Sequence, residues 1–177
     1  AHAARYRNRS RGVFSVPMVL RMPYGGGIHA PEHHSESYES TLVNTPGLQV
    51  VIPSNPYDAK GLLIHAIRQA DPVVFMEPKR SYRAFRAAVP LEAYEIPFGQ
   101  AATPRAGTDV TLIAYGAMVP VVMDAAEALA RDGIEAEVLD LRTVNPLDRE
   151  AIVASVEKTG RAVVVHEAPR ASGFGAV

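Results

Sequence analysis

Short apolar runs alternate with helix-like segments along most of this chain of 177 residues. Glycine, proline, asparagine or aspartate stands near the ends of these runs, which is typical of buried strands. Strands that alternate with helices favour parallel sheets built from right-handed βαβ units, so the sequence predicts an α/β fold. The expected strands are residues 16–22, 48–53, 71–78, 108–115, 135–143 and 161–168.

Two helix starts share the pattern Asn-Pro-x-Asp. In the first, we expect Asn55 to cap the helix, Pro56 to occupy its first position and Asp58 to lie in its first turn. This helix should extend to about residue 70. The apolar side chains that share one of its faces are expected to be Leu63, Ile67 and Ala70.

The second pattern begins at Asn145 and Pro146 and predicts a helix that ends at Gly160. Between the two patterns, apolar residues at helical spacing from Val119 to Ala130 predict a further helix, which ends at Gly133.

Proline and glycine are concentrated in the middle of the chain, at Pro90, Pro97, Gly99, Pro104 and Gly107. Such a stretch is typical of a connection between compact units. We therefore expect two α/β pieces, at 1–90 and 108–177, joined by a linker at 91–107. Because the chain starts at an alanine and ends without a polar tail, we also expect it to be a segment of a longer protein.

The composition favours a soluble protein and excludes several kinds of site. The net charge is −1 and 47% of the residues are hydrophobic, as in globular proteins. The chain has no cysteine, which excludes disulfides, zinc–thiolate sites and cysteine nucleophiles. No apolar run approaches the roughly 20 residues of a membrane span, and the balanced charge predicts no nucleic-acid partner. The arginines between Arg5 and Arg11 are expected at a solvated helix end rather than in a transit peptide.

Residues 25–36 read GGGIHAPEHHSE, and their histidines need an interpretation. His29, Glu32 and His33 match the H-x-x-E-H pattern of inverted zinc peptidases, which requires a helix. The three glycines and Pro31 disfavour a helix here, so we reject the zinc site. A glycine-rich loop after a parallel strand is nevertheless a common place for a ligand, and a histidine of the loop could face one. Residue chemistry alone leaves open which histidine this is.

Several longer segments resemble the beta subunits of thiamine diphosphate-dependent 2-oxo acid dehydrogenases, the decarboxylating component of the pyruvate and branched-chain complexes. The segments are PYGGGIHAPEHHSES, PGLQVVIPSNPYDAKGLLIHAIRQADPVVFMEPKRSYR, DVTLIAYGAMV, DLRTVNPLD and SVEKTGRAVVVHEAP. By this resemblance, residues before the linker are the later part of a pyrimidine-binding domain. Residues after it begin a transketolase carboxyl-terminal domain.

The resemblance also implies site residues. The family's catalytic histidine, which precedes a serine, matches His34, followed by Ser35 and Glu36. The glutamate that activates thiamine diphosphate is expected outside this chain, and the alpha subunit is expected to hold magnesium and the diphosphate. Some members bind potassium through backbone carbonyls. The matching positions are Val16, Met18, Val19, Ala66, Gln69 and Asp71.

The expected partners are an alpha subunit, a second beta subunit and a dihydrolipoyl acyltransferase, in the bacterial cytoplasm or, in a eukaryote, the mitochondrial matrix. His166, Glu167 and Arg170 are expected to face such a partner rather than substrate. The isolated segment is expected to be inactive, and the sequence leaves the choice of 2-oxo acid open. Two alternatives remain: a non-catalytic α/β assembly segment, and another transketolase-like enzyme.

Overall fold

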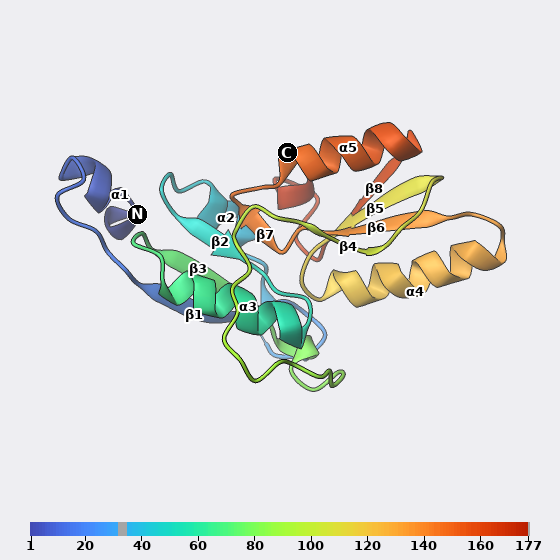
Figure 1. Ribbon diagram of the computed structural model, residues 1–177, viewed down its shortest axis with the longest axis horizontal. Helices are drawn as coiled ribbons and strands as arrows, with labels where there is room; N and C mark the ends of the chain where they lie inside the picture. The colour runs from blue at the N-terminus through green and yellow to red at the C-terminus, as the bar shows by residue number, and fades with distance from the viewer. Residues whose placement is uncertain (32–34, 177) are drawn as a thin grey trace.

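The computed structural model describes residues 1–31 and 35–176, which form two four-stranded sheets with helices around them (Figure 1). The first sheet has the order β1-β3-β2-β7. Its strands are β1 (Val19–Tyr24), β3 (Val73–Pro78), β2 (Gln49–Val51) and β7 (Thr143–Asn145). The first three are parallel, and β7 is antiparallel to β2. The sheet therefore takes three strands from the first half of the chain and one from the second.

The second sheet has the order β4-β6-β5-β8. Its strands are β4 (Ala102–Arg105), β6 (Ala136–Asp140), β5 (Val110–Ala114) and β8 (Ala162–Val165). Three of them are parallel, and β4 pairs antiparallel with β6. Parallel strands joined through helices confirm the α/β fold that the sequence predicts.

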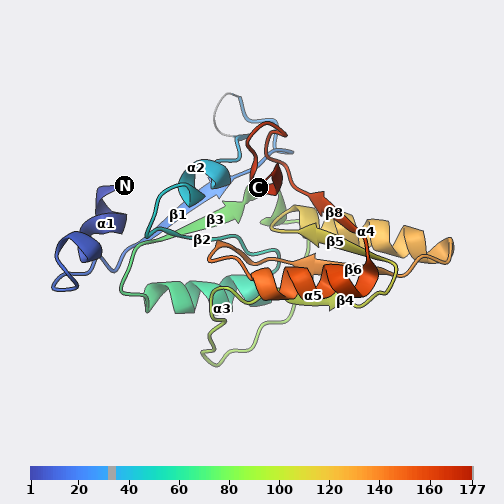
Figure 2. The same cartoon turned by 90° about the horizontal axis from the view of Figure 1, so that it is seen from above.

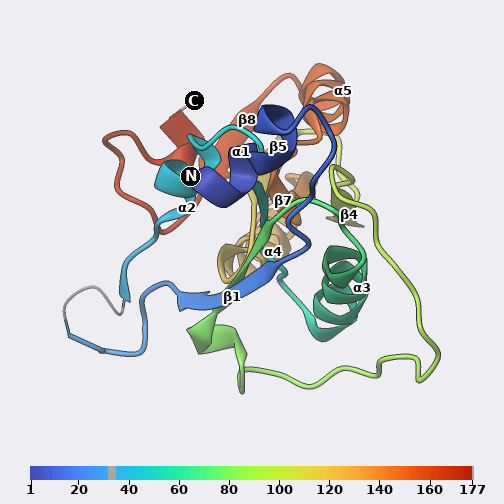
Figure 3. The same cartoon turned by 90° about the vertical axis from the view of Figure 1, so that its left-hand side faces the viewer.

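Helices connect the strands and cover the sheets. They are α1 (His2–Arg9), α2 (Glu39–Val43), α3 (Pro56–Ile67), α4 (Met118–Arg131) and α5 (Arg149–Thr159), with short 3-10 turns η2 (Lys79–Ser81) and η3 (Phe174–Ala176). α4 and α5 lie on opposite sides of the second sheet (Figure 1). The connection from β3 to β4 passes outside α3 (Figure 3). No helix in the described part of the chain is long and apolar enough to cross a membrane.

The predicted start of α3 is confirmed, and the buried face of the helix differs from the apolar face expected to carry Leu63, Ile67 and Ala70. The Asn55 side chain accepts a hydrogen bond from the Asp58 N–H at 2.9 Å, as an N-cap should. The buried apolar residues of the helix are instead Leu62 and Ala66, and Ile67 is 65% exposed. Leu62 and Ala66 pack between the first sheet and Ile96 of the outer connection. The first sheet and the connection that carries Ile96 therefore decide which face of α3 is buried.

The predicted cap of α5 is wrong. Asp148, not Asn145, caps the helix, because its carboxylate accepts a hydrogen bond from the Ala151 N–H at 3.0 Å. Asn145 ends β7, and its side-chain N–H donates to the Leu48 carbonyl at 2.6 Å. The helix does end at Gly160, in the left-handed conformation with φ of 70°.

A single apolar cluster runs through both sheets. It includes Val50 and Met76 of the first sheet together with Ile113 and Leu139 of the second. β4 lies within the range 91–107 that the sequence predicts as a linker, where it pairs with β6. The division of the chain at that range stays a prediction.

Candidate functional site

The glycine loop, residues 25–36, begins directly after β1 and is closed at its neck by a backbone hydrogen bond. The Gly25 N–H donates to the Glu36 carbonyl at 3.2 Å. Inside the loop, the Ser35 hydroxyl donates to the Ala30 carbonyl at 2.9 Å. The φ angles of Gly25 and Gly27 are +87° and +84°, a region that side chains rarely adopt. The glycines therefore let the chain turn sharply at the carboxyl end of a parallel strand.

The loop meets the end of the second sheet. A Cβ atom at Gly25 would lie 2.8 Å from a carboxylate oxygen of Glu167, so a side chain at this position would displace the end of Glu167. Arg80 lies 3.7 Å from Glu167 and also borders Gly27. Figure 2 shows the ends of β1 and β8 directed toward the same region. The carboxyl ends of strands from both sheets thus meet around the loop.

His34 lies outside the described residues, together with Glu32 and His33, so its catalytic role stays a prediction. His29 is described: it is exposed and has a φ of 54°. Among the described residues, no group of three or more His, Cys, Asp or Glu side chains could hold a metal ion.

Near the ends of the loop lie four side chains, here named the loop-side cluster: Tyr24, Glu39 and Tyr115 are buried, and His166 is partly buried. The Tyr115 hydroxyl donates to Glu39 Oε1 at 2.7 Å, and Glu39 is fully buried. The rings of Tyr115 and His166 are stacked, with centroids 6.3 Å apart. Burial, followed by the charge of Glu39, raises the pKa of Tyr24 and of Tyr115. Both hydroxyls therefore keep their protons at neutral pH.

Two polar atoms of this cluster are buried without a hydrogen-bond partner among the described residues. They are Glu39 Oε2 and His166 Nδ1. Buried polar atoms are usually paired, and an unpaired one carries a desolvation cost. The loop-side cluster is therefore incompletely satisfied.

The expectation that His166, Glu167 and Arg170 face a partner stays a prediction, although two of these side chains contact other parts of the chain. His166 contacts Tyr115, and Glu167 contacts the glycine loop and Arg80. Arg170 alone of the three is exposed. Nothing in the order of residues around the last strand indicates this inward direction, because it depends on how the first half of the chain lies against the second.

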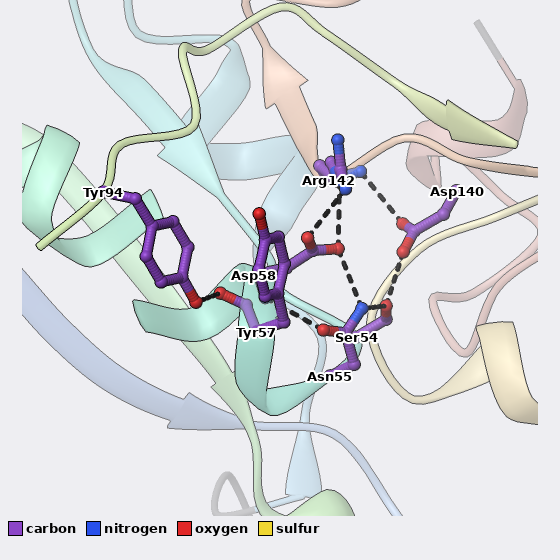
Figure 4. Close-up of polar contacts among 7 residues, drawn as sticks. All are labelled: Ser54, Asn55, Tyr57, Asp58, Tyr94, Asp140 and Arg142. Carbon is purple, nitrogen blue, oxygen red and sulfur yellow. Dashed lines mark hydrogen bonds and ion pairs between the residues drawn. The ribbon is translucent and has the colours of Figure 1, made fainter. Parts of the chain in front are cut away.

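A second polar group joins the two halves at the start of α3, and we name it the α3-side cluster (Figure 4). It consists of Ser54, Asn55, Asp58, Asp140 and Arg142. Arg142 binds Asp58 through two hydrogen bonds, Nε to Oδ2 at 3.0 Å and Nη2 to Oδ1 at 2.7 Å. Asp58 is only 1% exposed and Arg142 is partly buried, so this bidentate ion pair is largely shielded from solvent.

Asp140 is the second acid of the α3-side cluster. Its carboxylate accepts hydrogen bonds from the Ser54 hydroxyl and from the Arg142 backbone N–H. Burial is the largest influence on this group and raises its pKa to about 6. Asp140 therefore titrates close to the physiological range.

The residues predicted for a potassium site lie at one end of the first sheet. Val19 pairs with Val73, and the Met18 carbonyl accepts the Val73 N–H at 2.9 Å. The end of α3 leads into the same strand, and Asp71 there forms an ion pair with Arg7 at 2.8 Å. Strand and helix end are thus close together, but cation binding stays a prediction.

Comparison with known protein families relates both halves of the chain to transketolase domains. Residues 1–84 match the transketolase pyrimidine binding domain, and residues 99–177 match the transketolase C-terminal domain. The chain belongs to the transketolase-like family. The resemblance to 2-oxo acid dehydrogenase beta subunits is confirmed at high identity. The chain is 56% identical to the pyruvate dehydrogenase E1 component subunit beta of Acholeplasma laidlawii over 172 residues, 97% of this chain and 53% of the relative.

The subunit of the same name from Bacillus subtilis (strain 168) is 56% identical over 173 residues, 98% of this chain and 53% of the relative. The chain thus spans about half the length of the curated relatives it matches. Among solved structures, a split gene transketolase, described as an inactive beta4 tetramer, has a TM-score of 0.76 at 24% identity and covers 98% of this chain and 58% of its own. A Pichia stipitis transketolase has a TM-score of 0.65 at 15% identity, with coverage of 95% and 26%. These two structures show the fold alone.

Proposed function

We propose that the chain acts within a beta subunit of the decarboxylating component of a 2-oxo acid dehydrogenase, with pyruvate as its substrate. The observation that carries this proposal is the 56% identity to pyruvate dehydrogenase beta subunits over nearly the whole chain. The closed glycine loop at the carboxyl end of β1 supports it, since α/β proteins bind ligands at such strand ends.

Thiamine diphosphate would supply a carbon nucleophile that attacks the 2-oxo carbon and accepts the electrons released with carbon dioxide. The described residues fit one edge of such a site. Tyr24, Glu39 and Tyr115 are buried side chains at the two ends of the glycine loop, and Tyr115 donates a hydrogen bond to Glu39. The described residues do not fit the diphosphate, because no metal-binding group exists among them and Arg80 is directed to Glu167.

We therefore assign the diphosphate and its magnesium to the alpha subunit, and we assign the activating glutamate to no residue of this chain. His34 would donate a proton to the oxygen of the 2-oxo group, or stabilise its negative charge, while carbon dioxide leaves. A backbone potassium site at Met18, Ala66 and nearby carbonyls is part of the same proposal.

The partners proposed are an alpha subunit, a second beta subunit and a dihydrolipoyl acyltransferase that accepts the acyl group, in the cytoplasm as for a bacterial enzyme. The division into a pyrimidine-binding piece up to residue 90 and a carboxyl-terminal piece from residue 108 belongs to this proposal. So does the inactivity of the isolated segment, because it would lack the alpha subunit's share of the cofactor site.

The test is a substitution series in the complete alpha–beta assembly. His34→Ala should lower turnover of pyruvate about 10²- to 10⁴-fold, the range for a lost general acid or base. His29→Ala is the matched control, since His29 belongs to the same loop and is exposed, and it should retain nearly normal turnover. His33→Ala tests the alignment of the motif. If His33→Ala abolished turnover while His34→Ala did not, the assignment would be wrong by one residue; if neither mattered, the loop would have no catalytic histidine.

A further inference from the structure

We propose that Glu39 and Tyr115 are positioning residues, through which the second half of the chain holds the glycine loop in place. This inference deepens the function proposed above and rests on it. It concerns the two ends of the loop, which are both described, and the side chains that fix them.

Glu39 is an unusual residue to bury at this point. It is fully buried, and its hydrogen-bond partner is a neutral tyrosine hydroxyl rather than a cation. Its second oxygen has no partner among the described residues. A buried carboxyl in such surroundings carries a desolvation cost that one neutral hydrogen bond offsets only in part. Glu39 is therefore poorly suited to stabilise the fold, and a role in placing neighbouring groups explains it better.

The loop-side cluster lies at both ends of the glycine loop. Tyr24 directly precedes Gly25, and Glu39 begins α2, three residues after Glu36. The hydrogen bond from Gly25 to Glu36 joins these two ends. A shift of Glu39 would therefore move the closing end of the loop and, through the neck, its opening end.

The second half of the chain contacts both ends. Tyr115 follows β5 and holds Glu39. The next residue, Gly116, approaches Tyr24 so closely that a Cβ atom there would lie 2.2 Å from the Tyr24 hydroxyl. Glu167, which follows β8, borders Gly25. The position of the glycine loop is thus fixed by contacts with residues of the second sheet as well as by its own strand, β1.

These contacts matter because catalytic groups must be positioned accurately relative to the substrate. A misplacement of about 1 Å can lower a rate about 10²-fold, even when the altered residue does not touch the substrate. Catalytic residues keep their geometry only when packing and hydrogen bonds also fix the side chains that support them. The bond between Tyr115 and Glu39 fulfils this requirement for the loop.

The first experiment compares Tyr→Phe substitutions in the complete alpha–beta assembly. Tyr115→Phe removes only the hydroxyl that Glu39 accepts, and kcat should fall about 10- to 100-fold with an unchanged KM for the 2-oxo acid. Tyr94→Phe is the matched control, because its hydroxyl donates to the Tyr57 carbonyl at 2.7 Å, away from the loop. It should leave kcat unchanged.

A second pair of variants separates positioning from packing. Glu39→Gln retains an acceptor for Tyr115 and should restore most of the rate, whereas Glu39→Ala should behave like Tyr115→Phe. A loss of kcat that merely follows a loss of thermal stability in all these variants would overturn the proposal. An unchanged kcat in Tyr115→Phe would also overturn it if His34→Ala lowers kcat in the same assembly.

A readout without turnover makes failure of this inference distinguishable from failure of the proposed function. Amide hydrogen exchange at Gly25 and the following residues of the assembly should be faster in Tyr115→Phe and Glu39→Ala, and unchanged in Tyr94→Phe. If exchange is faster in Tyr115→Phe while His34→Ala has a normal turnover, the catalytic role of the loop is rejected. The positioning role of Glu39 and Tyr115 is then retained. Unchanged exchange in Tyr115→Phe would reject the positioning whatever the rates are.

Discussion

The α3-side cluster and the loop-side cluster join the same two halves of the chain, but they do so with opposite chemistry. In the α3-side cluster, the Asp58 carboxylate has a bidentate arginine, and both Asp140 oxygens accept a hydrogen bond. In the loop-side cluster, one hydroxyl binds one carboxyl oxygen, and two buried atoms have no partner among the described residues.

The difference separates two tasks. A saturated group of charges is rigid and is strongly destabilised when one member is lost. An unsaturated group contributes little to stability, yet it lies near the ends of the glycine loop. We infer that the α3-side cluster stabilises the contact between the two halves of the chain. The loop-side cluster instead positions the glycine loop.

The largest effect on stability is expected from Arg142→Ala. It would leave Asp58 buried without its cation, and the free energy of unfolding should fall by about 3–5 kcal/mol. Arg7→Ala is a suitable control, since Arg7 pairs with Asp71 at the surface, and it should cost about 0–1 kcal/mol. Chemical denaturation of the full-length subunit measures both. Equal losses in the two variants would contradict the role given to the α3-side cluster.

The next effect depends on pH and concerns Asp140. Its folded-state pKa of about 6 lies above its ordinary value of 3.8, so between these values the folded state binds the proton more tightly than the unfolded state. The contribution of Asp140 to stability is therefore greatest at low pH and falls as the pH rises through about 6. Asp140→Asn removes this dependence while keeping an acceptor for Ser54.

Denaturation of wild type and Asp140→Asn across about pH 4 to 7 should show the variant gaining relative stability as the pH rises, by at most about 3 kcal/mol. Because the two proteins are compared at each pH, the contributions of the other acidic groups to the free energy of unfolding cancel in the difference. A difference that stays constant with pH would show that Asp140 titrates normally.

The smallest effect tests the loop-side cluster. Gly116→Ala would place a methyl group 2.2 Å from the Tyr24 hydroxyl and 2.9 Å from Ile52, and Gly116 has a φ of +56°. Gly133, with a φ of +77° and no atom within 4 Å of a built Cβ, is the matched control. Gly116→Ala should cost about 1–3 kcal/mol more than Gly133→Ala, the usual cost of overpacking. Equal melting of the two variants would mean that Gly116 is not closely packed.

Local patterns in the sequence predicted the elements well, because they depend on neighbours along the chain. Asn55 and Gly160 are examples, since a cap and a left-handed helix end are decided within a few residues. The same reasoning failed at Asn145, which has an equally good cap pattern. There, pairing of β7 with β2 decided the outcome, and a contact across the chain outweighed the local preference.

The candidate site was only partly predictable. The glycine loop could be recognised from its own residues and from the family resemblance. The buried position of Glu39 could not, since a glutamate at the start of a helix normally faces solvent at the positive end of the dipole. Its burial depends on Tyr115, which is separated from it by 76 positions. Arg142 gave no signal for the same reason: its partner Asp58 is 84 positions away.

Strand β7 also affects the order in which the molecule can be made. The first sheet receives its last strand from residues 143–145, long after β1, β2 and β3 have been synthesised. Until those residues leave the ribosome, the edge of β2 has no strand to pair with, although Val50 and Val51 are wholly buried in the finished protein. An unpaired apolar edge is a site of aggregation. The nascent chain therefore carries an unpaired apolar edge from the synthesis of β3 until that of β7.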